Sequence, residues 1–242
     1  MRLGVIADIH GNAVALEAVL GALRQRGVAE VVNLGDLVSG PLWPAETLAL
    51  LRGAGIPSLR GNHDRWVAEG VGGASDHFAG AALTAGERAG LGGLPVHLRP
   101  LPGVLAFHAR PDDDDAYLLE DVAGGRLVPA SGAAVAARLG PTAEGLILCA
   151  HSHQAAIRQL PDGRVVVNPG SVGMPAYDDP TPPAHASVTG APHARFAVLE
   201  VEEGRLVAAE LVAIAYDHQA AVARAAANGR ADWAGWLGTG EA

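Results

Sequence analysis

The stretch that decides the fold is Arg60-Gly61-Asn62-His63-Asp64, which follows the short apolar run Ile56-Pro57-Ser58-Leu59. A run of this length, bounded by Pro and Gly, predicts a short strand that ends at the polar residues. An amide oxygen, an imidazole and a carboxylate therefore follow one another where the strand ends. Because Asn-His-Asp also suits an ordinary polar loop, the rest of the chain has to decide between these two interpretations.

The same arrangement, an apolar strand followed by a metal-binding residue type, recurs along the chain. Helical spacing of apolar residues predicts helices over residues 13–25 and 44–52, between the first three strands. Strands that alternate with helices pair in parallel, and ligands of such sheets bind beyond the carboxyl ends of the strands. We therefore expect the strand-end side chains to meet, and we predict seven metal ligands: Asp8, His10, Asp36, Asn62, His108, His151 and His153.

The chemistry of these ligands favours two ions. In Asp8-Ile9-His10 and His151-Ser152-His153, extended backbone would point both ligands of a pair to the same side. Carboxylates mixed with imidazoles suit Mn, Fe, Zn, Co or Ni. Seven ligands exceed what one ion takes, and fit two ions that share a carboxylate and activate a water for phosphoryl displacement. A lone histidine after a strand is more often an ordinary residue, and we treat the others so: His77, His97, His185, His193 and His218.

Composition narrows the class of protein. The chain has 242 residues, of which 49% are hydrophobic and 18% charged, and we expect one globular domain over residues 1–242. The net charge of -9 argues against partners such as long nucleic acid or a membrane surface. The N-terminus meets Asp8 too early for a signal peptide, so we expect a cytoplasmic protein, either a monomer or a homodimer. The single Cys149 excludes an internal disulfide and a cysteine-based zinc site.

Further along the chain the sequence predicts more helices, a loop and a hairpin. We expect two sheets packed on each other with helices outside. We expect Trp233, Trp236 and Leu237 to pack on the body of the protein, the alternative being a dimer contact. The expected elements are a helix over 78–94, two helical pieces within 117–139, a surface loop over 175–192, an antiparallel hairpin over 196–214 that turns at Glu203-Gly204, and a helix over 216–237 interrupted near Asn228-Gly229.

Taken in order, the motifs resemble those of a known family. Asp-x-His, Gly-Asp, Gly-Asn-His-Asp, a later single His and His-x-His resemble the calcineurin-like metallophosphoesterases, over residues 3–173. The run from Asn168 to Gly173 and the closing hairpin look like the small prokaryotic phosphodiesterase branch. The resemblance implies an α/β fold, a four-layer α-β-β-α sandwich of two mixed sheets flanked by helices. It also implies a dinuclear site, with Asp8, His10, Asp36 and His153 on one ion and Asp36, Asn62, His108 and His151 on the other.

The resemblance further implies catalytic and substrate-binding residues. His63 would contact the phosphate or protonate the leaving oxygen, and Asp64 would orient its imidazole. Imidazole suits this role because its unperturbed pKa lies near neutrality. Asn62 and His63 would both face the substrate. Of the divalent ions, manganese is expected, with Fe, Zn, Ni or Co as alternatives.

Two departures from the family pattern bear on the substrate. Ala150 stands where the family has Gly, so its methyl group must fit beside the metals. Ala109-Arg110-Pro111 replaces the usual Gly-Ser-Pro; Arg110 is either a phosphate contact or a solvated loop residue. Backbone N–H groups of Gly170, Ser171 and Gly173 could bind phosphate, or these residues could simply form a tight turn after a strand.

The leading hypothesis is metal-dependent hydrolysis of a small phosphodiester, with nucleotides and cyclic nucleotides among the candidates. A phosphomonoesterase or protein phosphatase is the first alternative. The protein phosphatase branch typically has Asp-Arg-Gly after its second aspartate, where this chain has Leu37-Val38-Ser39 after Asp36. It also usually has Gly-Asn-His-Glu, where this chain has Asp64 in the last position. A dinucleoside polyphosphate hydrolase is the second. A non-catalytic interaction module on the same fold is the hypothesis from another class, and it would be expected to have lost some of these residues.

Overall fold

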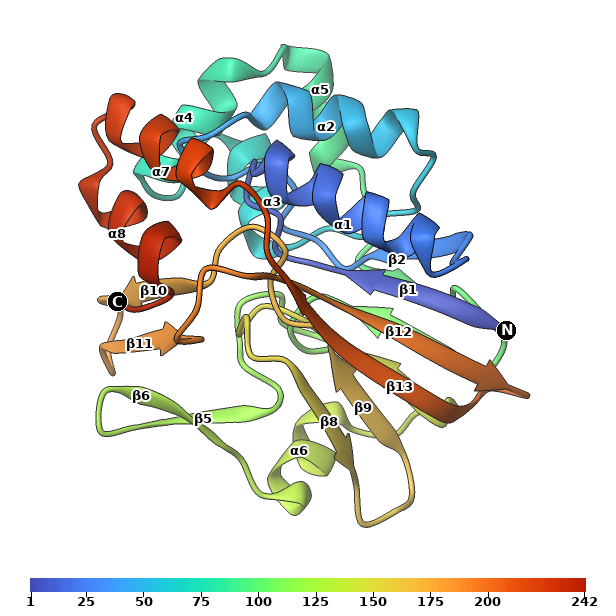
Figure 1. Cartoon of the computed structure of the whole chain (residues 1–242). Helices are drawn as coiled ribbons and strands as arrows, with labels where there is room; N and C mark the ends of the chain where they lie inside the picture. Colours follow the sequence, from blue (N-terminus) through green and yellow to red (C-terminus); the bar gives the residue numbers. More distant parts are fainter.

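The computed structural model describes residues 1–242 and contains two large sheets between outer helices (Figure 1). The first sheet has the strand order β13-β12-β1-β2. β1 and β2 pair in parallel, which confirms the predicted strand–helix–strand unit. β12 pairs antiparallel with both β1 and β13, and its pairing with β13 confirms the predicted closing hairpin. Its strands are β1 (Arg2–Ile6), β2 (Glu30–Asn33), β12 (Ala194–Glu202) and β13 (Arg205–Ile214).

The second sheet has the order β3-β4-β7-β9-β8, with β4, β7 and β9 parallel. Alternate residues of the two sheets share one buried cluster, which contains Leu3 and Val5 of β1 together with Val104 and Leu146 of the second sheet. The sheets therefore pack face to face. The strands are β3 (His97–Leu98), β4 (Val104–Phe107), β7 (Leu146–Leu148), β8 (Ala156–Gln159) and β9 (Val165–Asn168).

Helices cover the outer face of each sheet. Ile6 and Phe196 point away from the second sheet into a cluster formed with the amino-terminal helices. Phe107 and Ile147 point the opposite way, toward Val135 of α6. These layers confirm the α-β-β-α sandwich. The helices are α1 (Ala13–Gln25), α2 (Pro44–Gly53), α3 (Asn62–Glu69), α4 (Ala74–Ala82), α5 (Ala85–Gly92) and α6 (Gly132–Leu139).

A third sheet was not predicted. Its order is β10-β11-β6-β5, and it includes β5 (Glu120–Ala123), β6 (Arg126–Pro129), β10 (Ala176–Asp179) and β11 (His185–Val188). The prediction of helix at the start of 117–139 was therefore wrong, as was that of a loop over 175–192. Gly124 and Gly125, with φ of 60° and 72°, form a hairpin turn where the composition favoured a helix. The four-residue strands are only partly buried, so they carry no clear apolar period.

Two further predictions need correction. Residues 56–59 are extended but make only one bridge, between Asn33 and Ser58, so no full strand forms. The helix predicted over 78–94 is two helices, α4 and α5. Thr84 separates them, because its side chain accepts from Glu87 N–H and the Glu87 carboxylate accepts from Thr84 N–H.

The C-terminal helices α7 (His218–Ala227) and α8 (Ala231–Thr239) form as predicted, with the break at Asn228-Gly229. They pack on the body: Trp233 and Leu237 share a buried cluster with Leu42 and Met174. α8 lies beside β10 of the third sheet (Figure 1). None of the helices combines the length and apolarity that would be needed to cross a membrane.

We predict that Leu237→Ala lowers the free energy of unfolding by about 2–5 kcal/mol, because it leaves a cavity where α8 meets the body. Leu237 is fully buried. The matched control is Val207→Ala, since Val207 is 57% exposed and its loss should change stability by less than about 0.5 kcal/mol. Urea denaturation of both variants is the measurement. Equal stability of the two would contradict the docking of α8.

Candidate metal centre

Six of the seven predicted ligands follow the ends of strands in both large sheets. Asp8 and His10 follow β1, and Asp36 follows β2; His108 follows β4, and His151 and His153 follow β7. Asn62 is the first residue of α3. Because β1 and β2 are parallel, as are β4 and β7, the carboxyl ends of both pairs lie at one edge of the sandwich, where the side chains meet.

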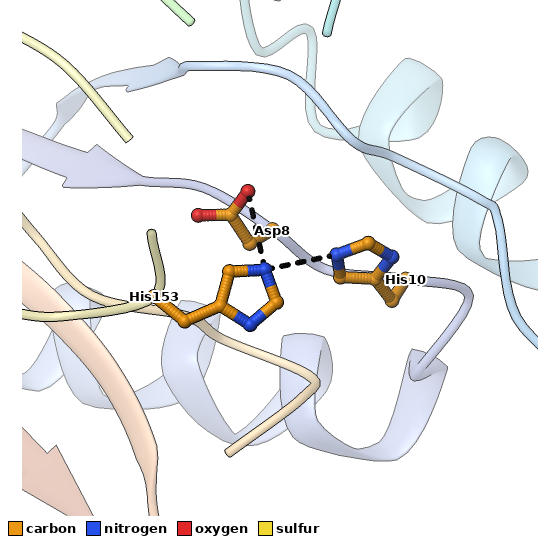
Figure 2. A group of neighbouring side chains, drawn as sticks. All are labelled: Asp8, His10 and His153. Carbon is orange, nitrogen blue, oxygen red and sulfur yellow. Dashed lines mark hydrogen bonds and ion pairs between the residues drawn. The ribbon is translucent and has the colours of Figure 1, made fainter. Parts of the chain in front are cut away.

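Asp8, His10 and His153 form the first of two candidate ligand groups (Figure 2). Their nearest ligand atoms lie within 4.8 Å of one another. Nε2 of His153 is 3.2 Å from Nε2 of His10 and 3.7 Å from Oδ1 of Asp8. Figure 2 shows the His153 ring nitrogen directed at both partners, although His153 is far from them in the sequence.

Asp36, His108 and His151 form the second group. The Asp36 carboxylate also reaches the first group, because its Oδ2 is 3.4 Å from Nε2 of His108 and 3.7 Å from Nε2 of His10. Asn62 joins through Oδ1, which lies 3.0 Å from His108 Nε2. The structure therefore brings all seven predicted residues together, with Asp36 between the two groups.

The backbone reaches this geometry in a way that the sequence argument did not foresee. Five of the ligands have positive φ: Asp8 53°, His10 51°, Asp36 55°, His151 71° and His153 60°. The prediction that Asp8-Ile9-His10 and His151-Ser152-His153 are extended was therefore wrong. They turn through the left-handed region immediately after the strand. His151 and His153 enter different groups, whereas Asp8 and His10 enter the same one.

Backbone carbonyls fix the orientation of the imidazoles. Nδ1 of His10, His108 and His153 lies 2.9, 2.7 and 2.8 Å from the carbonyl oxygens of Ser39, Leu34 and Met174 respectively. A carbonyl oxygen can only accept a hydrogen bond, so each Nδ1 carries a proton and Nε2 is the ring nitrogen that each imidazole turns toward the ligand groups. This outer hydrogen bond is the usual device for orienting a metal-binding histidine.

The Asp8 carboxylate indicates that the centre is built for a cation. It is fully buried, and neither oxygen has a hydrogen-bond partner. Burial raises the pKa of this carboxyl to about 8; the charge of His108 opposes the rise and that of Asp36 contributes to it. A buried carboxylate without a partner is costly, and a coordinated cation removes that cost. The ligand set of carboxylates and imidazoles suits divalent first-row metals.

His63 lies beside the centre, but its partner is not the predicted one. Its Nδ1 is 2.7 Å from Oδ1 of Asp76, and the Ser39 hydroxyl donates to the same carboxylate oxygen at 2.7 Å. Burial opposes protonation of His63, but the nearby Asp36 and Asp76 carboxylates outweigh it and raise its pKa to about 9. The expectation that Asp64 orients the imidazole was therefore wrong.

Asp64 instead fixes the backbone around the centre. Its carboxylate accepts the backbone N–H groups of Asp36 at 2.8 Å, Leu37 at 2.9 Å and Gly61 at 2.9 Å. The side chain is fully buried. Asp64 thus ties the loop that carries Asp36 to the start of α3, which makes it a structural support of the centre.

A cavity of about 580 Å³ opens over the ligands, and Asn62 and His63 both line it. Arg110 does not. It lines a second hollow of about 330 Å³, and its Nε donates to the carbonyl oxygen of Tyr117. Arg110 therefore does not line the main cavity, although His108 of the second ligand group lines the same hollow as Arg110.

The structure accommodates Ala150, which stands where the family has Gly, and it engages the backbone of residues 170–173. The methyl group of Ala150 is buried in the cluster between the two sheets, so the added atom is accommodated. The backbone of 170–173 is engaged within the protein: Gly170 N–H donates to Asn168 Oδ1, and Gly173 N–H donates to the Asp8 carbonyl. These residues form a tight turn that holds the Asp8 segment.

Sequence reasoning missed a set of residues that cover the centre. The ring centroid of Tyr117 lies 4.9 Å from that of the His151 imidazole, and the ring centroid of Tyr177 lies 4.8 Å from that of the His153 imidazole. Their hydroxyls are 2.8 Å apart, and the Tyr117 hydroxyl is also 2.8 Å from Nε2 of His185. We had treated His185 as ordinary because it follows no ligand-type strand. It belongs to the third sheet, which the sequence did not predict.

Comparison with known proteins decides the family. The model of the calcineurin-like phosphoesterase superfamily domain matches residues 1–204. The chain belongs to this superfamily. It is thus a metallophosphoesterase, a hydrolase of phosphoric esters from a family that binds divalent metals.

Similar proteins and structures agree with this fold. Protein MJ0912 of Methanocaldococcus jannaschii is 42% identical over 62 residues, so the match spans about a quarter, 26%, of either protein. A metallophosphoesterase from Sphaerobacter thermophilus has a TM-score of 0.71 at 22% identity, covering 97% of this chain and 100% of that one. Protein PH1004 from Pyrococcus horikoshii OT3 has a TM-score of 0.79 at 19% identity, covering 99% and 98%.

We predict that Asp8→Asn in this metallophosphoesterase lowers affinity for Mn²⁺ by more than about tenfold, because even mutation of a residue that only hydrogen-bonds to a metal ligand typically has an effect of that size. In metal-free protein the same change should not lower the melting temperature, since it removes a buried carboxylate that has no partner. Calorimetric titration and thermal unfolding with and without Mn²⁺ give the two readouts. Unchanged Mn²⁺ affinity would show that Asp8 is not a ligand.

We predict that Gly61→Ala weakens Mn²⁺ binding by steric means. A Cβ at this position would lie 2.1 Å from Oδ1 and 2.7 Å from N of Asp36, so the shared carboxylate must move. Gly86→Ala in α5 is the matched control, because a Cβ there meets nothing within 4 Å. The control should bind Mn²⁺ as the wild type does, and an equal loss in both variants would refute the steric argument.

Proposed function

We propose that this protein hydrolyses small phosphodiesters with two divalent metal ions, manganese being the expected metal. The observation that carries the proposal is the position of Asp36 Oδ2, within 3.4 and 3.7 Å of imidazole nitrogens from the two ligand groups. A carboxylate so placed suits a bridge between two ions. When bound, the ions supply Lewis acidity and an activated water. Asp8, His10, Asp36 and His153 would hold one, and Asp36, Asn62, His108 and His151 the other.

His63 is proposed to donate a proton to the leaving alcohol oxygen. Its Nδ1–H is held by Asp76, which leaves Nε2 to act in the cavity. The Asp76 carboxylate is 2% exposed and accepts from Ser39, from His63 and, through Oδ2, from Gly73 N–H. These contacts hold the imidazole in one orientation. Asp76 is thus a positioning residue that acts through His63.

We predict that His63→Ala lowers kcat by about 10²–10⁴, the usual contribution of general acid catalysis. Asp76→Asn should lower kcat by up to about 100-fold through misplacement of the imidazole, with metal content unchanged. Because Asp76 acts through His63, the double variant should be no slower than His63→Ala. Asp162→Asn, in an exposed loop, is the control and should retain wild-type kcat. Losses that multiply in the double variant would show that Asp76 has a separate role.

The proposal of a diester rather than a monoester substrate rests on the resemblance to the phosphodiesterase branch. A protein phosphatase remains disfavoured because Leu37-Val38-Ser39 follows Asp36 where that branch has an Asp-Arg-Gly run. The decisive experiment restores metal-stripped protein with separate metals and measures turnover of monoesters and diesters. Hydrolysis of monoesters alone would overturn the substrate class, and no turnover with any metal would favour a non-catalytic module.

A dinucleoside polyphosphate hydrolase is the remaining alternative. A crystal structure provisionally assigned as a diadenosine tetraphosphatase is similar to this chain, with a TM-score of 0.52 and 19% identity over 87% of it. At that identity the likeness concerns the fold alone. The charges around the cavity bear on this alternative directly.

A further inference from the structure

The walls of the main cavity are unusually aromatic for this chain. Tryptophan, tyrosine and phenylalanine together make up only ten of the 242 residues. Half of them line this one cavity, and they come from α3, from the segment before β5, from β10 and from α8: Trp66, Tyr117, Tyr177, Trp233 and Trp236. A concentration of large flat surfaces over one site indicates that they contact a ligand as well as support the fold.

Three of these aromatic residues are committed to the centre itself. Tyr117 and Tyr177 cover imidazoles of the ligand groups. Trp233 is 2% exposed, and its ring centroid is 6.1 Å from that of His10. Trp66 and Trp236 are only half-buried and line the cavity. These two side chains offer the apolar ring surface that a substrate can reach.

Trp66 lies beside the proposed proton donor. Its ring meets the His63 imidazole edge to face, with centroids 4.7 Å apart. A proton from His63 goes to the leaving oxygen, so the organic group attached to that oxygen must lie near Trp66. Trp236 lies on Trp233, with centroids 6.2 Å apart, on the wall formed by α8.

The charges of the cavity exclude a long phosphate chain. Outside the metal centre, the one Arg or Lys that lines it is Arg230, and its guanidinium is already bound to the Asp232 carboxylate and the Ser75 hydroxyl. Besides Asp36 and Asp76, four carboxylates line the cavity: Asp115, which accepts from Asn62, and Asp178, Asp179 and Asp232. A second or third phosphate within this cavity would meet these negative charges without a free cation to bind it.

Two of the tryptophan rings, unlike the carboxylates of the cavity, disfavour a cationic group. The Arg65 guanidinium lies 5.7 Å from the Trp66 ring centroid, and that of Arg230 lies 5.8 Å from Trp233. Both rings therefore already have a cation–π partner from the protein. A positively charged head group placed against them would meet a like charge. The group that fits against these rings is flat and uncharged.

We propose that the substrate is a phosphodiester with a single phosphate whose leaving alcohol carries a flat, uncharged aromatic group that stacks on Trp66, in the cavity that Trp236 also lines. Aryl-substituted alcohols and nucleosides share this chemistry. The inference rests on the proposed function, because it assumes that diesters are hydrolysed. It departs from the alternative of dinucleoside polyphosphates.

The test compares two diesters matched in size and in the basicity of the leaving alcohol, benzyl methyl phosphate and cyclohexylmethyl methyl phosphate. With wild-type protein supplied with Mn²⁺, kcat/KM should favour the benzyl ester by about tenfold, within the range measured for stacking on aromatic side chains. Trp66→Leu should reduce this ratio to near one. Trp43→Leu should keep it, since Trp43 is the one tryptophan that does not line the cavity. Phosphorus NMR follows both reactions.

Two further substrates distinguish the sources of the aromatic group and the rival class. Thymidine 5′-(methyl phosphate) should be hydrolysed faster than the benzyl ester if nucleosides are the natural source, and more slowly if smaller aryl alcohols are. Diadenosine tetraphosphate should be the slowest of the four. A ratio near one in the wild type, a ratio unchanged by Trp66→Leu, or preference for the tetraphosphate would overturn the inference. Failure to hydrolyse any diester would instead overturn the proposed function.

Discussion

The structure depends on one constraint, the left-handed backbone that follows three of its strands. Five candidate metal ligands have φ between 51° and 71°, and such conformations cost of order 1–3 kcal/mol for each residue. They persist because neighbouring segments determine them. Asp8 N–H donates to Gly35 O, His10 N–H to Asp36 O, and Gly173 N–H to Asp8 O. Asp64 adds bonds to the backbone of Asp36, so the loops hold one another in place.

This mutual support explains why glycines lie where they do. Gly35 and Gly61 pack directly against each other, and a Cβ on Gly35 would lie 2.6 Å from N of Gly61. A Cβ on Gly173 would lie 1.8 Å from the carbonyl oxygen of Ile9. Side chains there would separate the loops whose close approach brings the two ligand groups together. The Gly-Asp and Gly-Asn-His-Asp motifs thus encode contact between loops as much as ligand identity.

The sequence predicted the ligands because their identity and order are local properties. Each lies directly after an apolar run, and parallel pairing brings such positions together without further information. The positive φ values had a signal that we did not use, because Asp and His tolerate the left-handed region better than most residues. Asp76 had none. It lies thirteen positions after His63, at the start of a separate helix, and meets it only because α4 packs against α3.

The third sheet was unpredictable for another reason. Its strands are four residues long and partly exposed, so neither alternation nor burial marks them, and their pairing joins segments about 60 residues apart, such as β6 and β11. Yet this sheet supplies Tyr177 and His185, which anchor the tyrosine pair over the histidines. Local patterns therefore revealed the ligands, whereas the side chains that enclose them required the tertiary structure.

This division has a functional meaning. The ligand groups come from strand ends within residues 1–204, the part matched by the family model, whereas Trp233 and Trp236 belong to α8, beyond that match. The floor of the cavity can hold metal and phosphate whatever the organic part of the ester. The walls are built from α3, α4, β10 and α8, and those of their side chains that contact no candidate ligand, such as Trp236 and Asp178, can change without disturbing the floor. If the proposed function is right, specificity would be set mainly by these walls, and the paired Arg230 and exposed Asp178 would bear on the substrate as the ligands bear on the chemistry.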